Sequence, residues 1–310
     1  MRAVLSVLLA LLLLVPCAAT GEASPAAEPA LFSMPLPIDF SGGMVPQEEF
    51  YADDWTYEDP TISVHIKYRD DLEDYMTGYK GNKKAGAWVA EIRLGDASQL
   101  RTLSAVSFNK KDSRAVEQMA GWVNAVIAFN GDFAARRSEG LIIRQGETFK
   151  NKLKGTLDVL AIDEAGDFHL IPRPKKGEVG DSIDGKKIIN AFYFGPILVN
   201  NGEVSEKFAA KPNYLHEDEF YARLGICQLG PLHYKMIITT MQDVTVGMRL
   251  ADFARLCRDE GAVSAYNLDG GYSAAMIFRG RMVNDEKNAE PRTVPDIVYF
   301  ASAWNGEDIE

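Results

Sequence analysis

Alternating and continuously apolar runs rich in β-branched and aromatic residues recur along most of the chain, and this pattern is typical of strands. Turn residues such as Gly, Asn, Asp and Pro separate the runs. The pattern therefore predicts a strand-dominated protein, with strands at Ile62 to Tyr68, Ala87 to Leu94, Leu103 to Phe108, Ala125 to Asn130, Leu141 to Arg144, Leu157 to Ile162, Phe192 to Val199, Ala222 to Gln228, Tyr234 to Thr240, Ser264 to Leu268, Ala274 to Phe278 and Ile297 to Ser302.

Helical periodicity is clear in only two places. Leu250, Phe253, Ala254 and Cys257 fall on one face of a helix expected between Gly247 and Gly261, and a weaker helix is expected from about residue 113 to 121. Because strands outnumber helices, we predict an α+β fold with a strand-rich mixed β-sheet and few helices, and not a doubly wound nucleotide-binding fold. No internal repeat or interior linker is evident, so one domain is expected.

The N-terminus has the three parts of a secretory signal peptide. Arg2 precedes an apolar run from Val4 to Val15, and small residues at Cys17 and Ala19 suit cleavage after residue 19. Residues 20–60 are rich in Pro, Ala, Ser and acids and are expected to be an exported linker, which leaves residues 61–310 as the folded domain. No later segment is apolar for long enough to span a membrane, so we expect a secreted, extracellular protein with no stable membrane span after cleavage.

Charge and cysteine content narrow the possible partners. The chain has 310 residues and a net charge of -11, which argues against nucleic acid as a partner. Cys227 and Cys257 are the cysteines that remain after the signal segment, and either a disulfide or two buried thiols is compatible with export. The oligomeric state cannot be predicted from the sequence.

Standard catalytic motifs are absent. The segment HEDEF at 216–220 lacks the second His of a zinc protease motif, and no P-loop, nucleophile elbow or EF-hand loop occurs. We therefore predict no cofactor and no metal site, and any chemistry must rest on Asp, Glu, Arg, Asn and Ser.

The segment NLDGGYS at 267–273 is the most informative candidate site. It places Asn267 and Asp269 at the end of an expected strand, and two glycines follow, Gly270 and Gly271. Glycines allow a ligand to approach the backbone closely, which would leave Asp269 and Ser273 exposed to it. A glycine hairpin turn with a solvated Asp is the alternative.

Other polar residues also gather at strand ends. The segment NGDF at 130–133 places Asn130, Gly131 and Asp132 after an apolar run, although Asn-Gly also favours a hairpin turn. Arg223 lies within an apolar run, where a charge must be paired or must face a cleft. Three residues near the last strand, which either fold back towards the site or lie in a solvated loop, complete the set: Asn284, Glu290 and Arg292.

In their order along the chain these segments resemble the signatures of the phosphodiester glycosidase family, to which the animal uncovering enzyme belongs. The resemblance covers the chain from about residue 63 to the C-terminus and rests on NGDF at 130–133, GLIIRQG at 140–146, FGPILVNNG at 194–202, YARLGI at 221–226, NLDGGYSAAM at 267–276, VN at 283–284 and PRTVPDIVYF at 291–300. Family sequences often have glycine where this chain has Asp132 and Tyr272.

The resemblance implies a hydrolase that releases a sugar similar to N-acetylglucosamine from a sugar-1-phosphodiester in envelope or extracellular glycans. Asp269 is then the first candidate for the catalytic carboxylate, and Asp132 or Glu290 the second. Arg223, Arg292 and the backbone of Gly270 and Gly271 would hold the phosphate. Two alternatives remain: a non-catalytic glycan-binding protein, and a metal-dependent phosphodiesterase that uses Asp132, Asp269 and Asp296 as ligands.

Overall fold

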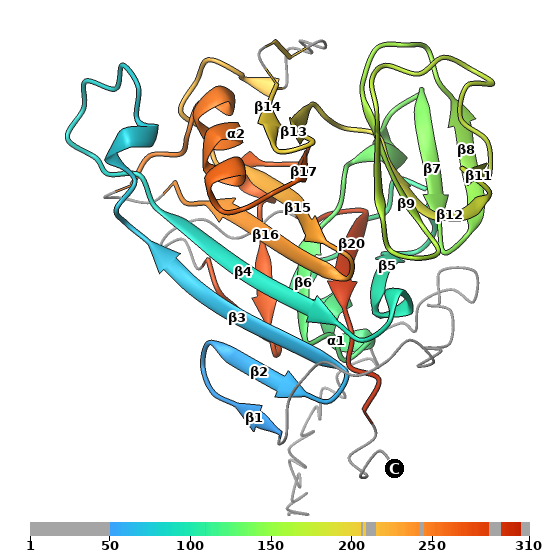
Figure 1. The fold of residues 1–310 in the computed structure, drawn as a ribbon, viewed down its shortest axis with the longest axis horizontal. Helices are drawn as coiled ribbons and strands as arrows, with labels where there is room; N and C mark the ends of the chain where they lie inside the picture. The colour runs from blue at the N-terminus through green and yellow to red at the C-terminus, as the bar shows by residue number, and fades with distance from the viewer. Residues whose placement is uncertain are drawn as a thin grey trace, which may run out of the picture.

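The computed structural model describes residues 50–108, 110–205, 207–208, 215–241, 245–284 and 293–304, and within them the chain forms three antiparallel β-sheets and two α-helices. The sheets have nine, six and five strands. In Figure 1 the nine-stranded sheet lies to the left, the six-stranded sheet forms the lobe at the right, and β6 and β20 of the five-stranded sheet lie between them. This strand-rich architecture confirms the α+β prediction.

The nine-stranded sheet contains the longest strands and carries helix α2. Its order is β1(Tyr51–Ala52), β2(Thr56–Asp59), β3(Ile62–Arg69), β4(Ala87–Leu94), β16(His233–Thr239), β15(Leu224–Gly230), β17(Ser264–Leu268), β13(Ile197–Asn200), β14(Glu203–Val204). Helix α2, Leu250–Asp259, buries Phe253, Ala254 and Cys257, as its periodicity predicts. A Cβ at Gly225 of β15 would lie 3.0 Å from the Phe253 ring, so glycine here allows the helix to pack closely on the sheet.

The six-stranded sheet is formed by one continuous part of the chain, whereas the five-stranded sheet combines strands from before it and after it. The six-stranded sheet has the order β10(Phe168–Ile171), β9(Val159–Asp163), β12(Lys186–Phe192), β7(Gly140–Arg144), β8(Glu147–Lys152), with β11(Ser182–Ile183) paired to β12. The five-stranded sheet has the order β19(Arg281–Met282), β18(Met276–Phe278), β6(Ile127–Asn130), β20(Asp296–Phe300), β5(Leu100–Ser104), and α1(Val116–Trp122) packs against β6 and β20. One large apolar core contains side chains from all three sheets.

Several boundaries differ from those expected. The predicted strand from Phe192 to Val199 covers most of β13 but only the last residue of β12, because the chain turns at Gly195 and Pro196 and passes from the six-stranded to the nine-stranded sheet. Strand β8 was not predicted, since its exposed and half-buried residues lack an apolar alternation. Strands β1 and β2 pair ahead of β3, so the sheet begins earlier than the predicted domain start at 61.

The N-terminal predictions lie mostly beyond what the structure describes. The signal segment 1–19 and most of the linker 20–60 fall outside the described residues. Within the described part, no helix has the length and apolarity needed to cross a bilayer. Cys227 and Cys257 are both buried free thiols, one on β15 and one on α2.

Candidate functional site

A cavity of about 660 Å³ lies where ends of the three sheets meet. Its wall includes residues that follow β6, residues that follow β12, the start of β15, and the end of β17. The lining residues are Phe133, Arg136, Arg137, Ser138, Glu139, Phe194, Leu215, His216, Tyr221, Ala222, Arg223, Asn267, Leu268, Asp269, Gly270, Tyr272 and Ser273. Four predicted site residues of the NLDGGYS segment therefore share one cavity: Asn267, Asp269, Gly270 and Ser273.

Gly270 and Gly271 are needed because the residues just before β15 pack directly against them. A Cβ on Gly270 would lie 2.3 Å from the carbonyl oxygen of Ala222, and Gly271 has φ of +59° and donates its N–H to the same oxygen at 2.9 Å. We expected a ligand to be the group that approaches these glycines. Instead residues Tyr221 and Ala222, which precede β15, approach them, and Gly271 does not line the cavity.

Asn130 holds the Asp269 turn in place from the neighbouring sheet. Its Nδ2 donates to the Asp269 carbonyl at 2.8 Å, and its Oδ1 accepts from the Ala275 N–H at 3.0 Å. The side chain is buried and does not line the cavity. Asn130 is therefore a positioning residue for Asp269, and the substrate contact predicted for it is not seen.

Asn267 and Asn284 also bond to backbone, with different consequences. Asn267 Nδ2 donates to the Gly195 carbonyl at 2.9 Å, which ties the end of β17 to the β12–β13 connection at the cavity wall. Asn284 accepts from the Met276 N–H at 2.8 Å and donates to the Ala274 carbonyl at 2.9 Å. Because Asn284 is buried and lies outside the cavity lining, its predicted role in substrate binding becomes a structural one.

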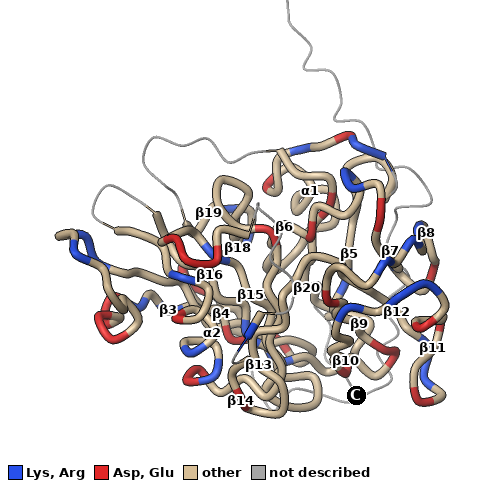
Figure 2. Tube along the Cα trace, turned by 90° about the horizontal axis from the view of Figure 1, so that it is seen from above, with Lys and Arg blue, Asp and Glu red and all other residues tan. Residues whose placement is uncertain are grey.

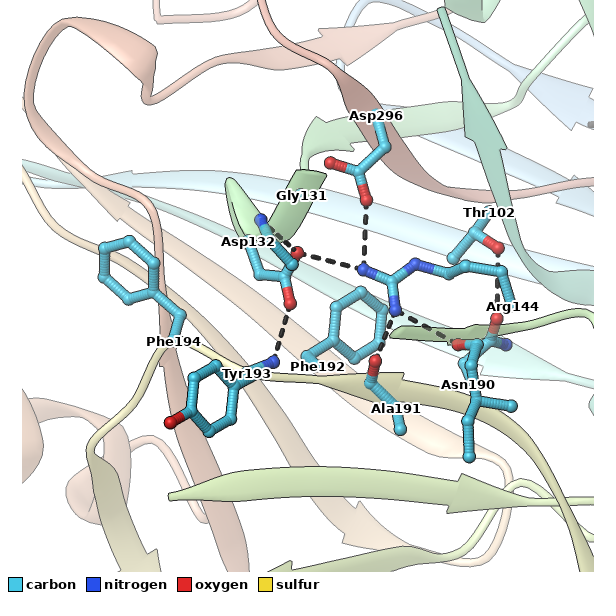
Figure 3. A network of polar contacts seen from close by, with 12 residues as sticks. Thr102, Gly131, Asp132, Arg144, Asn190, Ala191, Phe192, Tyr193, Phe194 and Asp296 are labelled. Atoms are coloured by element: carbon cyan, nitrogen blue, oxygen red, sulfur yellow. Dashed lines mark hydrogen bonds and ion pairs between the residues drawn. The ribbon is translucent and has the colours of Figure 1, made fainter. Parts of the chain in front are cut away.

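A buried ion network lies behind the cavity and joins two of the sheets (Figure 3). Arg144 Nη2, at the end of β7, donates to Asp132 Oδ1 at 2.9 Å and to Asp296 Oδ2 at 3.0 Å. The guanidinium also donates to the Ala191 carbonyl and lies 4.3 Å from the centre of the Phe192 ring. All three charged side chains are almost completely shielded from solvent.

Asp132 therefore differs from the predicted second acid. Its Oδ2 accepts from the Tyr193 N–H at 2.6 Å, its side chain is fully buried, and it does not line the cavity. A carboxylate that accepts several hydrogen bonds in the interior is a structural anchor, and here it fixes the residues after β6 against the end of β12. The catalytic assignment of Asp132 is not supported by this position.

The network also bears on the metal-dependent alternative. Two of the three carboxylates proposed as ligands, those of Asp132 and Asp296, already face the guanidinium of Arg144, which occupies the position between them. No group of three or more His, Cys, Asp or Glu suited to a metal ion is found in the part of the chain that the structure describes. This ligand set is therefore not supported.

Arg223 has a structural position, in contrast to the phosphate clamp expected from the sequence. Its guanidinium donates to the carbonyl oxygens of Met248, Leu215, His216 and Glu219 at 2.9, 2.7, 2.6 and 3.1 Å. Burial lowers the pKa of this group to about 10, so it stays charged at neutral pH. Bonding to four carbonyls uses most of the guanidinium donors and fixes residues 215–219 at the cavity wall.

Two cations that were not predicted do line the cavity. Arg136 is the last residue of the 3₁₀ turn Ala134–Arg136, which follows NGDF, and Arg137 caps this turn. Arg136 is exposed. Arg137 donates to the Tyr193 carbonyl and lies 4.7 Å from the centre of the Phe194 ring. The segment AARRSE directly after a candidate site was the sequence signal for this basic wall.

Aromatic and acidic groups complete the cavity wall. His216 stacks on Tyr221 with ring centres 4.9 Å apart, and the Tyr272 side chain is 50% exposed. Glu139 accepts a hydrogen bond from Thr156 at 2.7 Å. This hydrogen bond is the main reason why the pKa of the Glu139 carboxyl is lowered, and the charge of Lys154 lowers it further. Glu139 is therefore an ionised second carboxylate of the cavity. Glu290 and Arg292, both predicted site residues, lie outside the described residues.

The carboxylate of Asp296 leaves no space for a side chain at Gly131. A Cβ at Gly131 would lie 2.4 Å from Asp296 Oδ1 and 2.6 Å from its Cγ and Oδ2. We expect Gly131→Ala to lower the free energy of unfolding by about 1–3 kcal/mol, because the buried network has no space to move. Gly121→Ala is the matched control, since a Cβ there meets nothing within 4 Å, and should be neutral or slightly stabilising. Equal effects in urea unfolding would contradict the argument.

Asp296 leads to a second prediction, on pH. Burial raises its pKa from 3.8 to about 6, against the attraction of Arg144 and with a smaller contribution from the charge of Asp132. A raised folded-state pKa means that the folded protein favours the protonated acid, so the contribution of Asp296 to stability is greatest below pH 3.8 and declines as pH rises to about 6. The unfolding free energy of wild type minus that of Asp296→Asn should therefore decrease across this range and level off above it. A difference that rises with pH would contradict this.

Comparisons with protein families and with solved structures agree with each other. The phosphodiester glycosidase family matches residues 123–301 of this chain. Curated proteins give no match. Among solved structures, the catalytic domain of zebrafish N-acetylglucosamine-1-phosphodiester alpha-N-acetylglucosaminidase, auto-inhibited by its pro-peptide, is similar with a TM-score of 0.64 at 17% identity, covering 82% of this chain and 88% of that one.

Two bacterial structures share the fold more distantly. A hypothetical protein from Synechocystis has a TM-score of 0.51 at 14% identity, covering 77% of this chain and 62% of that chain. A putative exported protein from Burkholderia pseudomallei has a TM-score of 0.50 at 13% identity, with 74% and 76% covered. At these identities the three structures establish a common fold.

Proposed function

Because the chain belongs to the phosphodiester glycosidase family, which matches it over residues 123–301, we propose that it is a hydrolase that releases a sugar from a glycosyl-1-phosphodiester. The name of the zebrafish enzyme gives N-acetylglucosamine as the sugar of that protein. A similar sugar is the first substrate to test here.

One observation carries the proposal: Asp269 lines the same cavity as Arg136 and Arg137. Arginine offers a planar fork of donors that matches phosphate oxygens. A carboxylate next to a phosphate-binding pair is the arrangement that cleavage beside a phosphodiester requires, because one group acts at the sugar and the other holds the leaving group.

The chemistry needs little acid assistance. Water attacks the anomeric carbon, the bond from that carbon to the phosphate oxygen breaks, and the electron pair leaves with the phosphate as a stable anion. We propose that Asp269 either removes the proton from the attacking water or stabilises the cationic sugar, while Arg136 and Arg137 bind the phosphate. The rings of Tyr221 and Tyr272 offer apolar faces for the sugar.

The location of the substrate is a second part of the proposal. The basic and apolar composition of residues 1–19 supports export, and an exported enzyme of this class would act on envelope or extracellular glycans.

The test is hydrolysis of N-acetylglucosamine-1-phosphodiesters with a small alcohol as the second ester, together with a panel of other sugars. We expect free sugar and a phosphomonoester as products, and in ¹⁸O-labelled water the label should enter the sugar. Label in the phosphate would identify a phosphodiesterase that breaks the P–O bond. Binding without turnover on the whole panel would identify a glycan-binding protein, and either result would overturn the proposal.

A further inference from the structure

Two neighbouring segments of the six-stranded lobe carry positive charge without any acid. In residues 148–154 and 173–176 every charged residue is a Lys or an Arg, although the chain as a whole has a net charge of -11. Figure 2 shows Lys and Arg along β8 and the loops beside it. We call the exposed members the basic strip, which comprises Lys152, Lys154, Arg173, Lys175 and Lys176.

The backbone brings the two segments together. Lys154 and Lys175 form an antiparallel bridge, and the Gly155 N–H donates to the Pro174 carbonyl at 3.0 Å. A Cβ on Gly155 would lie 3.2 Å from the Lys175 side chain, which shows how closely the segments pack. Like charges placed side by side repel one another, and this cost is offset when an anion binds to them.

Few acids oppose the basic strip. Lys154 forms an ion pair with Glu139 at 3.3 Å, and the Glu178 carboxylate accepts from the backbone N–H of Lys175. Among the described residues, the side chains of Lys152, Lys175 and Lys176 form no ion pair. The basic strip is therefore available to a ligand with several negative charges.

The basic strip lies next to the cavity wall. Lys154 forms an ion pair with Glu139, which lines the cavity. Lys150 of β8 donates from its Nζ to the carbonyls of Ala134 and Arg137 at 2.8 and 2.7 Å, on the turn that carries the cavity arginines. Cations therefore lie both at the cavity, where one phosphodiester would be cleaved, and on the neighbouring surface of the lobe, with Glu139 at the junction.

We infer that the basic strip is a binding track for a polyanionic substrate in which sugar phosphodiesters repeat, so that phosphates beyond the cleaved bond contact Lys152, Lys175 and Lys176. The inference rests on the proposed function and extends it from a single phosphodiester to a polymer. Single-stranded nucleic acid is also a polyanion, but proteins that bind it add aromatic rings for base stacking. The aromatic residue of segments 148–154 and 173–176 is Phe149, and its ring packs against Phe108 with ring centres 5.1 Å apart.

The experiment compares a short and a long substrate. The short one is a single sugar-1-phosphodiester, and the long one is an oligomer of the same sugar linked by phosphodiesters. In the triple variant Lys152→Gln, Lys175→Gln and Lys176→Gln, we expect kcat/KM for the oligomer to fall roughly ten- to fiftyfold at low salt, since each exposed contact contributes little alone. For the short substrate the value should stay within about twofold, and high salt should remove the preference of the wild type for the oligomer.

A matched control removes the same charge elsewhere. Lys80→Gln, Lys83→Gln and Lys84→Gln together change exposed lysines of the segment between β3 and β4 and should leave both substrates unaffected. Equal losses on both substrates, or no loss on either, would overturn the inference.

Direct binding separates this inference from the proposed function. If the wild type cleaves neither substrate, the proposed function fails, but binding of the oligomer measured by fluorescence anisotropy still tests the basic strip. We expect the strip variant to bind the oligomer roughly tenfold more weakly than the wild type. Unchanged binding, or single-stranded DNA bound as tightly as the oligomer, would overturn the inference.

Discussion

Asp269→Asn should lower kcat by roughly 10²- to 10⁴-fold, the range expected when a positioned acid-base group is lost. The amide keeps the shape of the side chain but can neither remove a proton from water nor stabilise a cationic sugar. The fold should be unaffected, because Asn130 holds this turn through the backbone carbonyl of Asp269 and not through its carboxylate. Steady-state kinetics on a sugar-1-phosphodiester, with thermal unfolding alongside, measures both effects.

Glu139→Gln is the matched comparison for this prediction. It removes one negative charge from the same cavity, but the carboxylate of Glu139 is held by Thr156 and Lys154. We expect a loss of about tenfold or less. If Glu139→Gln abolishes turnover while Asp269→Asn retains it, the catalytic assignment belongs to Glu139.

Arg144→Met should be the most destabilising single substitution in the site region. Asp132 and Asp296 would be left facing each other in the interior without a counter-ion, and removal of one partner from a buried ion pair costs about 3–5 kcal/mol. That is a large part of the total stability of a typical domain, about 5–15 kcal/mol. Urea unfolding at pH 7 measures the loss.

Two further measurements identify the cause of that loss. Adding Asp132→Asn and Asp296→Asn to Arg144→Met removes the unpaired charges and should restore much of the stability. The loss from Arg144→Met alone should also shrink as pH falls from neutral towards 6, because Arg144 lowers the pKa of Asp296 and in its absence this carboxyl takes up a proton at a higher pH than in the wild type. An unfolding free energy for Arg144→Met within 1 kcal/mol of wild type, on the scale of an exposed pair, would show that the network contributes little.

The sequence predicts most of the strands that bury a face, although β12, which buries Ile188, Ala191 and Phe192, is predicted only at its last residue. Strands β4 and β17 have the predicted bounds because buried apolar residues recur along both of them. Strand β8 has only polar or half-buried positions, and its pairing with β7 depends on a neighbour that no local pattern reveals. Periodicity detects burial, so an edge strand is seen only when its sheet is known.

The site shows the same limit for charged residues. A buried Asp in an ion network and a catalytic Asp in a cavity look alike in sequence. Asp132 was predicted to be catalytic, whereas the structure places it in a network with Arg144 and with Asp296, which is distant along the chain. Arg223 was misread for a different reason. Its acceptors are backbone carbonyls, which every residue has and no pattern marks.

The pairing of β5 with β20 sets the order in which this protein can be completed during synthesis. Leu100 pairs with Phe300, so β5 must wait for a strand that is synthesised much later. Until β20 arrives, Asp296 is missing from the network and the five-stranded sheet is divided between β5 and β6. Contacts this distant close slowly. A nascent chain that lacks β20 therefore also lacks the Asp296 carboxylate that faces Arg144, and the turn after β6 that leads to the cavity should be fully fixed only once β20 has been synthesised and paired.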